Sequence, residues 1–230
     1  MASEALVTKN LSRRFGTRWA LADLSLSVGP GEVFGFLGPN GAGKTTAIRC
    51  ILGLIAPTSG TVEILGESER TRRLRDVGAM VETPAFHTFL TARENLRVSA
   101  AYGGIDPESI DSVLAEVGLA DRADERVSDF SLGMRQRLGL ARAMLGEPRV
   151  MILDEPTNGM DPRGIGEVRT LILGLKSRGV AVLMSSHLLA EVSQVCDTVG
   201  ILSEGRLVHT GRVTSDLEST YLAVTRGGVH

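Results

Sequence analysis

The sequence predicts an α/β fold with a mostly parallel sheet, an antiparallel β part near the N-terminus and an inserted α-helical subdomain. Strand-like and helix-like patterns alternate in residues 1–83 and again in 146–230, whereas strand signals are missing from 84–145. A glycine-rich loop also follows an apolar run and precedes a helical pattern. Such alternation is typical of a parallel sheet that binds ligands at the carboxyl ends of its strands. We therefore expect one domain over 1–230, in which 1–83 and 146–230 form the core and 84–145 the helical subdomain.

The first third of the chain contains the antiparallel strands and the first buried strand. Strand patterns cover residues 5–10, 21–28, 32–37, 61–65 and 77–81. The run 32–37 (EVFGFL) is short and apolar, as expected of a buried strand. After Lys44 the apolar residues recur at helical spacing until about Gly53, which predicts a helix directly after the glycine-rich loop.

Three helices are expected in the middle of the chain. Thr91 precedes a helical pattern and is followed three residues later by Glu94, the spacing of a capping box. Pro107 opens the second helix, because proline is favoured in a first helical turn. The third helix covers residues 131–145. Helices without intervening strands indicate an insert in the α/β core.

The α/β alternation resumes in the last third of the chain. The expected elements are a strand at 150–153, a helix at 162–177, a strand at 180–184 and a helix at 188–195. Residues 198–202 and 206–210 flank the turn Glu204-Gly205 and predict a hairpin.

The composition is that of an ordinary globular protein. The net charge of −2 at pH 7 gives no overall cationic field, which argues against nucleic-acid binding. The cluster Arg70, Arg72, Arg73 and Arg75 is expected to be a solvated helix face. Cys50 and Cys196 have no ligand-like neighbours, so both are expected to be free and buried.

The opening residues 1–16 lack the basic and apolar regions of a secretory signal peptide. No stretch of the sequence approaches 18 uninterrupted apolar residues, so no membrane-spanning helix is expected. These two observations predict a chain that stays in the cytosol.

Residues 38–45 (GPNGAGKT) match the phosphate-binding pattern G-x-x-x-x-G-K-[ST] at every specified position. Glycines permit a backbone whose N–H groups converge on an anion, and the following helix adds the positive end of its dipole. Lys44 would neutralise the β- and γ-phosphates, and the Thr45 hydroxyl would ligate Mg²⁺. The nucleotide-binding residues predicted here are Gly38, Pro39, Asn40, Gly41, Ala42, Gly43, Lys44, Thr45 and Thr46.

Residues 150–155 (VMILDE) form an apolar run that ends in two carboxylates. A buried strand would place Asp154 at its carboxyl end, where the side chain can hold Mg²⁺ directly or through water. Glu155 is then the candidate general base that polarises an attacking water. Together with the phosphate loop, this run predicts a P-loop nucleotide hydrolase with a RecA-like core.

Four further segments indicate which kind of P-loop hydrolase this is. Residues 131–137 (SLGMRQR) resemble the LSGGQ signature of ABC ATPases, and residues 158–161 (NGMD) match the D-loop of that family. His187 matches the family's switch histidine, and Phe15 falls where the family stacks an aromatic ring on adenine. The motifs follow the family's order over essentially the whole chain. Residues 77–96 and the signature are most similar to ATPase subunits of bacitracin- and lantibiotic-type exporters.

The resemblance implies a head-to-tail dimer that closes on two ATP molecules, with the phosphate loop of one subunit facing the signature of the other. Ser131 and the amide of Gly133 would then contact the γ-phosphate of the partner's ATP. Met134 and Asp161 complete the nucleotide-binding residues expected from these motifs. The residues alone also allow a plainer interpretation of Ser131, as the N-cap of a helix.

The catalytic residues implied by the resemblance are Lys44, Glu155 and His187. His187 would reach the γ-phosphate and hold the attacking water together with Glu155. Phe15 would stack on adenine, although either Phe15 or the nearby Trp19 could instead be a core residue.

The sequence departs from the family's pattern in two places. Glu82 stands where the family usually has a glutamine that senses Mg²⁺ and the attacking water. A carboxylate can also ligate Mg²⁺, so the expected metal-site residues are Thr45, Glu82 and Asp154, but Glu82 adds negative charge beside the triphosphate. In the signature, Leu132 replaces a glycine and Met134 a glutamine, which puts in doubt the contacts made through that glutamine.

We therefore expect the ATP-hydrolysing subunit of an export-type ABC transporter, using ATP and Mg²⁺, pairing with a second ATPase subunit and docking on a separately encoded membrane subunit. The chain would sit at the cytoplasmic face of the membrane. Residues 83–91 are expected to border the docking groove, although their apolar side chains could equally be core. The alternative is a soluble ABC ATPase acting on nucleic acid or the ribosome, which the charge of the chain disfavours.

Overall fold

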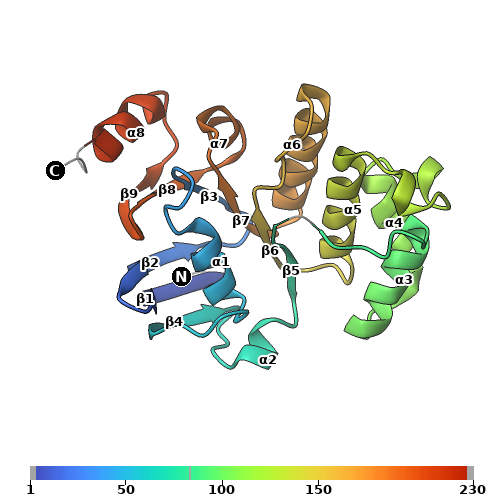
Figure 1. Ribbon diagram of the computed structural model, residues 1–230, viewed down its shortest axis with the longest axis horizontal. Coiled ribbons are helices and arrows are strands. Elements are labelled where there is room, and N and C mark those ends of the chain that lie inside the picture. The colour runs from blue at the N-terminus through green and yellow to red at the C-terminus, as the bar shows by residue number, and fades with distance from the viewer. Residues whose placement is uncertain (1–3, 83, 227–230) are drawn as a thin grey trace.

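The computed structural model describes residues 4–82 and 84–226, which form two sheets with helices around them (Figure 1). The smaller, antiparallel sheet has the strand order β2-β1-β4, with β1 (Leu6–Phe15), β2 (Arg18–Val28) and β4 (Ser59–Ile64). The larger sheet has the order β5-β6-β7-β3-β8-β9, with β3 (Val33–Leu37), β5 (Val77–Met80), β6 (Val150–Asp154), β7 (Ala181–Ser186), β8 (Thr198–Ser203) and β9 (Arg206–Arg212). Only β9 pairs antiparallel in this sheet. The predicted fold class is confirmed.

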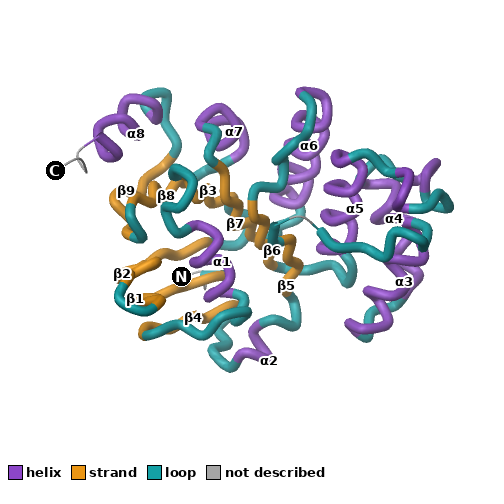
Figure 2. Tube along the Cα trace, in the orientation of Figure 1, coloured by secondary structure: helices purple, strands orange, loops and turns teal. Residues whose placement is uncertain are grey.

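The helices occupy three places around the larger sheet (Figure 2). Helix α1 (Lys44–Ile51) packs between the two sheets, whereas α6 (Pro162–Ser177) and α7 (Leu189–Val195) cover the other face of the larger sheet. The helices α3 (Ala92–Gly103), α4 (Ile110–Glu116) and α5 (Leu132–Met144) gather beyond the β5 edge. The remaining helices are the short α2 (Arg70–Arg73) and α8 (Leu217–Arg226) near the C-terminus.

The central strands are apolar throughout because both of their faces are covered. Along β6, Val150 and Ile152 pack into the core that contains α1, while Met151 and Leu153 pack into the core that contains α6 and α7. Successive side chains of a strand point to opposite faces, so one short run supplies both cores. Burial on two faces thus fixes the central strands, whose carboxyl ends carry the predicted motifs.

The start of α3 shows how local sequence sets an element. The Thr91 hydroxyl accepts a hydrogen bond from the Glu94 N–H at 3.1 Å, and the Glu94 carboxylate accepts one from the Thr91 N–H at 2.8 Å. This is the predicted capping box, and an N-cap of this kind contributes about 0.5–2 kcal/mol. The helix predicted to open at Pro107 instead begins with a 3₁₀ turn, Pro107–Ser109, before α4.

The arginine cluster was expected to be a solvated helix face, whereas no helix was predicted for residues 217–226. Its first three arginines lie on α2, which has no buried residue, and Arg75 follows the helix; Arg73 donates to the Ile51 carbonyl at 3.2 Å. Helix α8 buries Leu217 and packs Tyr221 and Val224 against the core. The spacing of these three apolar residues, four and then three apart, was the available signal for α8.

Both cysteines are free and buried, as predicted. Burial raises the pKa of the Cys50 thiol to about 11 and that of the Cys196 thiol to about 12, so both remain protonated at neutral pH. None of the helices within 4–82 and 84–226 combines the length and apolar character needed to cross a bilayer.

Candidate functional site

The carboxyl ends of β3, β7 and β6 lie side by side because these strands are neighbours in the larger sheet. In the parallel ladders Leu37 pairs with Ser186, and Asp154 pairs with Ser185. The phosphate-loop pattern follows Leu37, the acidic pair begins at the end of β6, and His187 follows β7. Strand pairing therefore collects three motifs that are far apart in sequence at one place, termed here the carboxyl edge.

A cavity of about 840 Å³ opens beside the glycine-rich loop. All residues from Pro39 to Thr46 line it, together with Phe15 and Glu155. Its volume lies within the range of small-molecule sites, which is roughly 300–1,000 Å³. Gly38 lies beneath the loop, where an added Cβ would be 2.4 Å from the Leu202 carbonyl oxygen. The predicted loop thus forms one wall of a cavity large enough for a nucleotide.

The loop depends on glycine at Gly43, whose φ of 109° is in the left-handed region. A Cβ there would also lie 2.6 Å from the Ala20 carbonyl oxygen, so a side chain is excluded by both strain and space. Helix α1 begins at the next residue, Lys44, and its unpaired N–H groups point into the loop. Loop and helix together present the donors that a phosphate requires.

The Lys44 ammonium lies under the loop and is only 5% exposed. Its Nζ donates to the Gly38 carbonyl at 2.6 Å and to the Pro39 carbonyl at 3.3 Å. The nearest carboxylate oxygen is Oε1 of Glu155, at 3.5 Å. Because two of these partners are neutral carbonyls, much of the charge on Lys44 remains available to an anion in the cavity.

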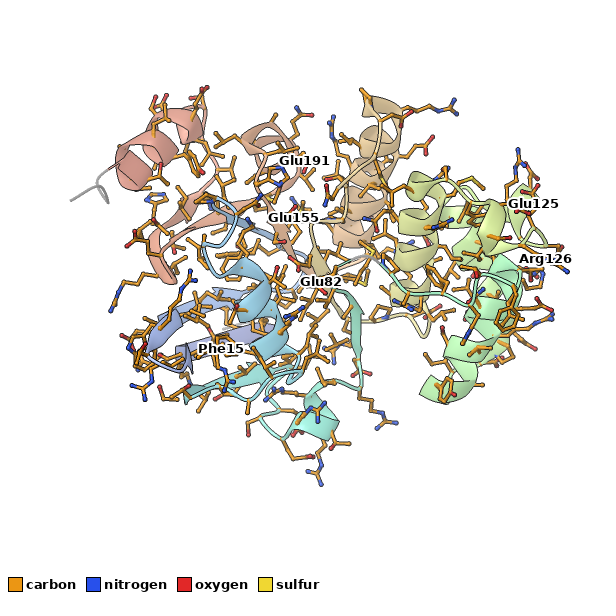
Figure 3. The ribbon with its side chains drawn as sticks, viewed as in Figure 1. Phe15, Glu82, Glu125, Arg126, Glu155 and Glu191 are labelled. Atoms are coloured by element: carbon orange, nitrogen blue, oxygen red, sulfur yellow. The ribbon has the colours of Figure 1, made fainter. Side chains whose placement is uncertain are left out.

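Glu155, labelled in Figure 3, lies between Lys44 and His187 at the carboxyl edge. Its Oε1 faces Lys44, while its Oε2 lies 3.0 Å from Nδ1 of His187. The Glu155 side chain is 23% exposed, so water reaches the carboxylate. A carboxylate held between a cation and an imidazole next to a phosphate-binding loop has the geometry of a general base.

Ser185 fixes the backbone at the acidic pair. Its hydroxyl donates to Oδ1 of Asp154 at 2.5 Å and accepts the N–H of Glu155 at 2.9 Å. The hydrogen bond to Glu155 offsets part of an unfavourable backbone, since the φ of Glu155 is 47°, in the left-handed region. Glu82 has the same backbone region, with a φ of 57°. Non-glycine residues with such a φ are uncommon and concentrate at functional sites.

A second hollow of about 190 Å³ lies between the end of β6 and the segment after β5. Thr45, Glu82, Asp154 and Glu155 line it with oxygen atoms, which are the ligands that Mg²⁺ prefers. Gln136 also lines it, and its Oε1 is buried without a hydrogen-bond partner among the described residues. The donor set therefore fits a hard divalent cation.

Within 4–82 and 84–226, no three His, Cys, Asp or Glu side chains are arranged to hold a metal by themselves. A cation in this hollow would therefore need the Thr45 hydroxyl and further ligands from a bound nucleotide, as is usual for Mg²⁺ at phosphates. The Glu82 side chain is 60% exposed, and it forms an ion pair with Arg49 of α1.

Phe15 and Trp19 both line the 840 Å³ cavity and are 48% and 47% exposed. Neither ring is therefore a core residue. The Arg13 guanidinium stands over the Phe15 ring, 4.5 Å from its centroid, and that of Arg14 stands 5.5 Å from the Trp19 ring. An exposed ring at the cavity mouth can stack on a purine base.

The signature residues lie apart from this cavity. Ser131 caps α5, accepting the Met134 N–H at 3.2 Å, and a Cβ on Gly133 would meet no atom within 4 Å. Asp161 likewise caps α6, accepting the Gly164 N–H at 2.8 Å. None of Ser131, Gly133, Met134 and Asp161 is among the described residues that line the cavity. A single chain does not bring them to its own phosphate loop.

Several residues that line the site were not predicted from the sequence. The turn Ser203–Gly205 and Thr225 of α8 line the large cavity, and Gln136 lines the smaller hollow. Gln136 also donates to the Asn158 carbonyl at 3.3 Å. The arginine–glutamine–arginine run after the signature was a signal for Gln136, whereas the turn and Thr225 reach the cavity only through tertiary packing.

The family model described as ABC transporter matches residues 21–158. The chain is 49% identical over 212 residues to the bacitracin transport ATP-binding protein BcrA of Bacillus licheniformis, covering 90% of this chain and 69% of that protein. It is 38% identical to the lantibiotic transport ATP-binding protein SrtF of Streptococcus pyogenes, covering 88% and 89%. A solved ATP-binding subunit of an ABC transporter superposes with a TM-score of 0.84 at 30% identity, over 97% of this chain and 96% of that one.

These similarities agree with the motifs, their order and the cavity at the carboxyl edge, and they confirm the resemblance read from the sequence. They give no support to the alternative of a soluble ATPase acting on nucleic acid or the ribosome. The chain belongs to the ABC transporter ATP-binding family and is an ABC-type ATPase.

Proposed function

We propose that this chain is the ATPase subunit of an exporter that moves a peptide antibiotic or a related small molecule through separate membrane subunits. The observation that carries the chemistry is Glu155, held between Lys44 and His187 at the mouth of the nucleotide cavity. The names of BcrA and SrtF, which are transport ATP-binding proteins for bacitracin and for a lantibiotic, support the class of cargo.

The nucleotide would bind with its base on Phe15 and its phosphates in the loop 39–46. The converging N–H groups and the start of α1 favour the phosphate charge. Lys44 would release the carbonyls of Gly38 and Pro39 and turn to the β- and γ-phosphates. These contacts bind ATP before any step of hydrolysis.

Thr45, Glu82 and Asp154 would hold Mg²⁺ in the smaller hollow. The cation supplies charge neutralisation at the β- and γ-phosphates when it is bound. Asp154 is already oriented by the Ser185 hydroxyl at 2.5 Å. Glu82 would exchange its ion pair with Arg49 for the cation or its water.

In hydrolysis, Glu155 would take a proton from water as the water attacks the γ-phosphate. His187 orients the carboxylate through the 3.0 Å contact between Nδ1 and Oε2, which leaves its Nε2 free to face the phosphate. Lys44 stabilises negative charge on the phosphate as the bond to the leaving group breaks.

The signature residues would complete the site in a head-to-tail dimer, in which the homodimer is the simplest case. Ser131 and the Gly133 amide at the start of α5 would face the γ-phosphate in the partner's cavity, with Met134 beside them. Asp161 would lie at the same interface. Closure on two ATP molecules and reopening after hydrolysis supply the two states that a transporter needs.

The core over 1–83 and 146–230 and the helical subdomain over 84–145 are the proposed units of this motion. The segment 83–91 joins them and would border the groove for the membrane subunit. Thr83 lies outside the described residues, Pro84 is buried, and Phe89 is 69% exposed. An exposed phenylalanine beside a buried anchor suits docking at the cytoplasmic face of the membrane.

Isolation of the tagged chain from its own cells in mild detergent, with mass spectrometry of what accompanies it, tests this function. A protein with several membrane spans in stoichiometric amount is the expected result. Membrane vesicles that contain this membrane protein and the chain can then be loaded with bacitracin- or lantibiotic-type peptides, and ATP-dependent transport of the peptides tests the cargo. Recovery of ribosomal or DNA-repair proteins, with no membrane protein, would overturn the transport proposal and leave the ATPase chemistry standing.

A further inference from the structure

Glu191 in the first turn of α7 is a buried carboxylate to which neither the sequence analysis nor the proposed mechanism assigns a role. The residue is only 7% exposed. Its Oε1 accepts a hydrogen bond from the Thr157 hydroxyl at 2.7 Å, and its Oε2 accepts one from the Ser186 hydroxyl at 2.8 Å. No Lys, Arg or His among the described residues forms an ion pair with it. Burying a carboxylate without a cation is costly. If this position only filled space in the core, an apolar side chain would stabilise the fold more.

The two hydroxyls lie next to the proposed catalytic pair, one in the loop after β6 and the other at the last residue of β7. Thr157 lies two residues after Glu155, and Ser186 immediately precedes His187. The Ser186 hydroxyl also accepts the Leu188 N–H at 3.0 Å, so it fixes the backbone on both sides of His187. Glu191 therefore links the loop after β6 to the end of β7, directly before His187.

The same region contains a small hollow of about 110 Å³ lined by both loops. Glu155, His187 and Glu191 all border it, together with the residues 157–160 of the D-loop region. A loop that borders a hollow is not held by packing alone, because atoms are missing on one side. The Glu191 hydrogen bonds therefore add to those that Ser185 makes with Asp154 and Glu155, and they hold the two segments together on the side of this hollow.

We infer that Glu191 is a positioning residue for ATP hydrolysis, which holds the carboxylate of Glu155 and the imidazole of His187 in register through Thr157 and Ser186. This inference rests on the proposed roles of Glu155 and His187. The contact that Glu191 would maintain is the one between Oε2 of Glu155 and Nδ1 of His187, which are 3.0 Å apart. A misplacement of about 1 Å in such a pair can lower a rate by about 100-fold. The phosphate loop makes no hydrogen bond to Glu191, so ATP binding should not depend on it.

The test uses the full chain and compares Glu191→Ala, Glu191→Gln and Thr157→Val in kcat, KM, equilibrium ATP binding and Tm. We expect Glu191→Ala to lower kcat about 10- to 100-fold while the Kd for ATP changes less than about twofold. A glutamine side chain can accept a hydrogen bond from one of the two hydroxyls and donate one to the oxygen of the other. Glu191→Gln should therefore keep most of the wild-type kcat. Thr157→Val keeps the side-chain shape but removes one hydroxyl, and should fall between the two.

Ser193→Ala is the matched control, because Ser193 lies on the same helix and its exposed hydroxyl bonds only to the Ala190 carbonyl. It should leave every parameter unchanged. The double variant Glu191→Ala with Thr157→Val should be no slower than Glu191→Ala alone, since both break one link.

Wild-type kcat in Glu191→Ala would overturn the inference, as would equal damage from Glu191→Gln and Glu191→Ala. Parallel loss of ATP affinity, kcat and Tm would also overturn it, because that pattern is a general loss of structure. If Glu191→Ala does not fold, Thr157→Val carries the same comparison. Failure of the proposed chemistry is seen separately, in a Glu155→Gln variant that hydrolyses ATP as fast as wild type.

Discussion

The carboxyl edge of the larger sheet and the signature end of α5 (residues 131–134) are two parts of the site with opposite construction. At the carboxyl edge the polar groups are bonded to one another: Lys44 to loop carbonyls, Asp154 to Ser185, and Glu155 to His187. At the signature end, Ser131 makes one local capping bond, Leu132 is 48% exposed and the space around Gly133 is open. One region is complete within the chain, whereas the other presents its groups outward.

This difference indicates how catalysis can be controlled by association. A preorganised edge can bind ATP in a single chain, because its donors are already in place. In the proposed head-to-tail dimer, the outward-facing signature end would add its contacts only when a second chain is present. Substitutions at the carboxyl edge should therefore act within one chain, and substitutions at the signature end should act on the partner.

Glu155→Gln is the change with the largest expected effect on the carboxyl edge. Removal of the base should lower kcat by about 100-fold or more, while the amide keeps the size of the side chain and leaves ATP binding intact. The measurement is phosphate release together with equilibrium binding of ATP. Glu147→Gln is the matched control, since Glu147 is also in the left-handed region, with a φ of 52°, but lies outside the site. Equal phosphate release by wild type and Glu155→Gln would remove Glu155 from the mechanism.

Ser131→Asp tests the signature end. Aspartate caps helices as well as serine does, so the stability of α5 should be kept. Its charge would oppose the γ-phosphate of the partner's ATP, and we expect the ATPase rate to fall about 10- to 100-fold. Binding of ATP to the variant's own phosphate loop should be unchanged.

Mixing the Ser131→Asp chain with a Lys44→Ala chain tests whether the residue acts on its partner. Each variant alone is expected to have strongly reduced activity, but in the proposed head-to-tail pair one of the two sites contains an intact phosphate loop and an intact signature. We expect measurable ATPase activity to return on mixing. Absence of any recovery, with mixed dimers shown to form, would place Ser131 in its own chain's site.

Local motifs and contacts between distant segments differ in how far the sequence could predict them. The phosphate loop was predicted residue by residue, because its chemistry follows from local glycines, Lys44 and Thr45. The capping box at Thr91 and Glu94 is equally local. The links from Glu191 to Thr157 and from Arg49 to Glu82 were missed because they span 34 and 33 residues, and only strand order and helix packing bring these partners together. Motif spacing predicts side chains on one loop, but not the hydrogen bonds that join two loops.

Phe15→Ala examines the proposed platform for the base at the cavity mouth. Loss of stacking should weaken ATP binding by about 1–3 kcal/mol, or about 5- to 150-fold in Kd, with little effect on kcat at saturation. The single tryptophan, Trp19, lines the same cavity, so its fluorescence can report binding in both proteins. Tyr102→Ala, at a ring that is 90% exposed, is the control and should bind ATP normally. An unchanged Kd in Phe15→Ala would leave the base without its proposed platform.

Arg49→Met has the smallest expected effect and asks why a carboxylate is tolerated at Glu82. Arg49 on α1 pairs with Glu82, so its positive charge offsets the extra negative charge beside the triphosphate. Both side chains are substantially exposed, at 39% and 60%, which limits such a pair to less than about 1 kcal/mol. Arg49→Met should therefore raise the Kd for Mg²⁺-ATP by no more than about fivefold at low salt, and by less at high salt. In a Glu82→Gln background the same substitution should have a smaller effect, because the charge to be offset is gone. Equal effects of Arg49→Met in both backgrounds would show that Arg49 acts on the nucleotide directly, and that Glu82 does not need it.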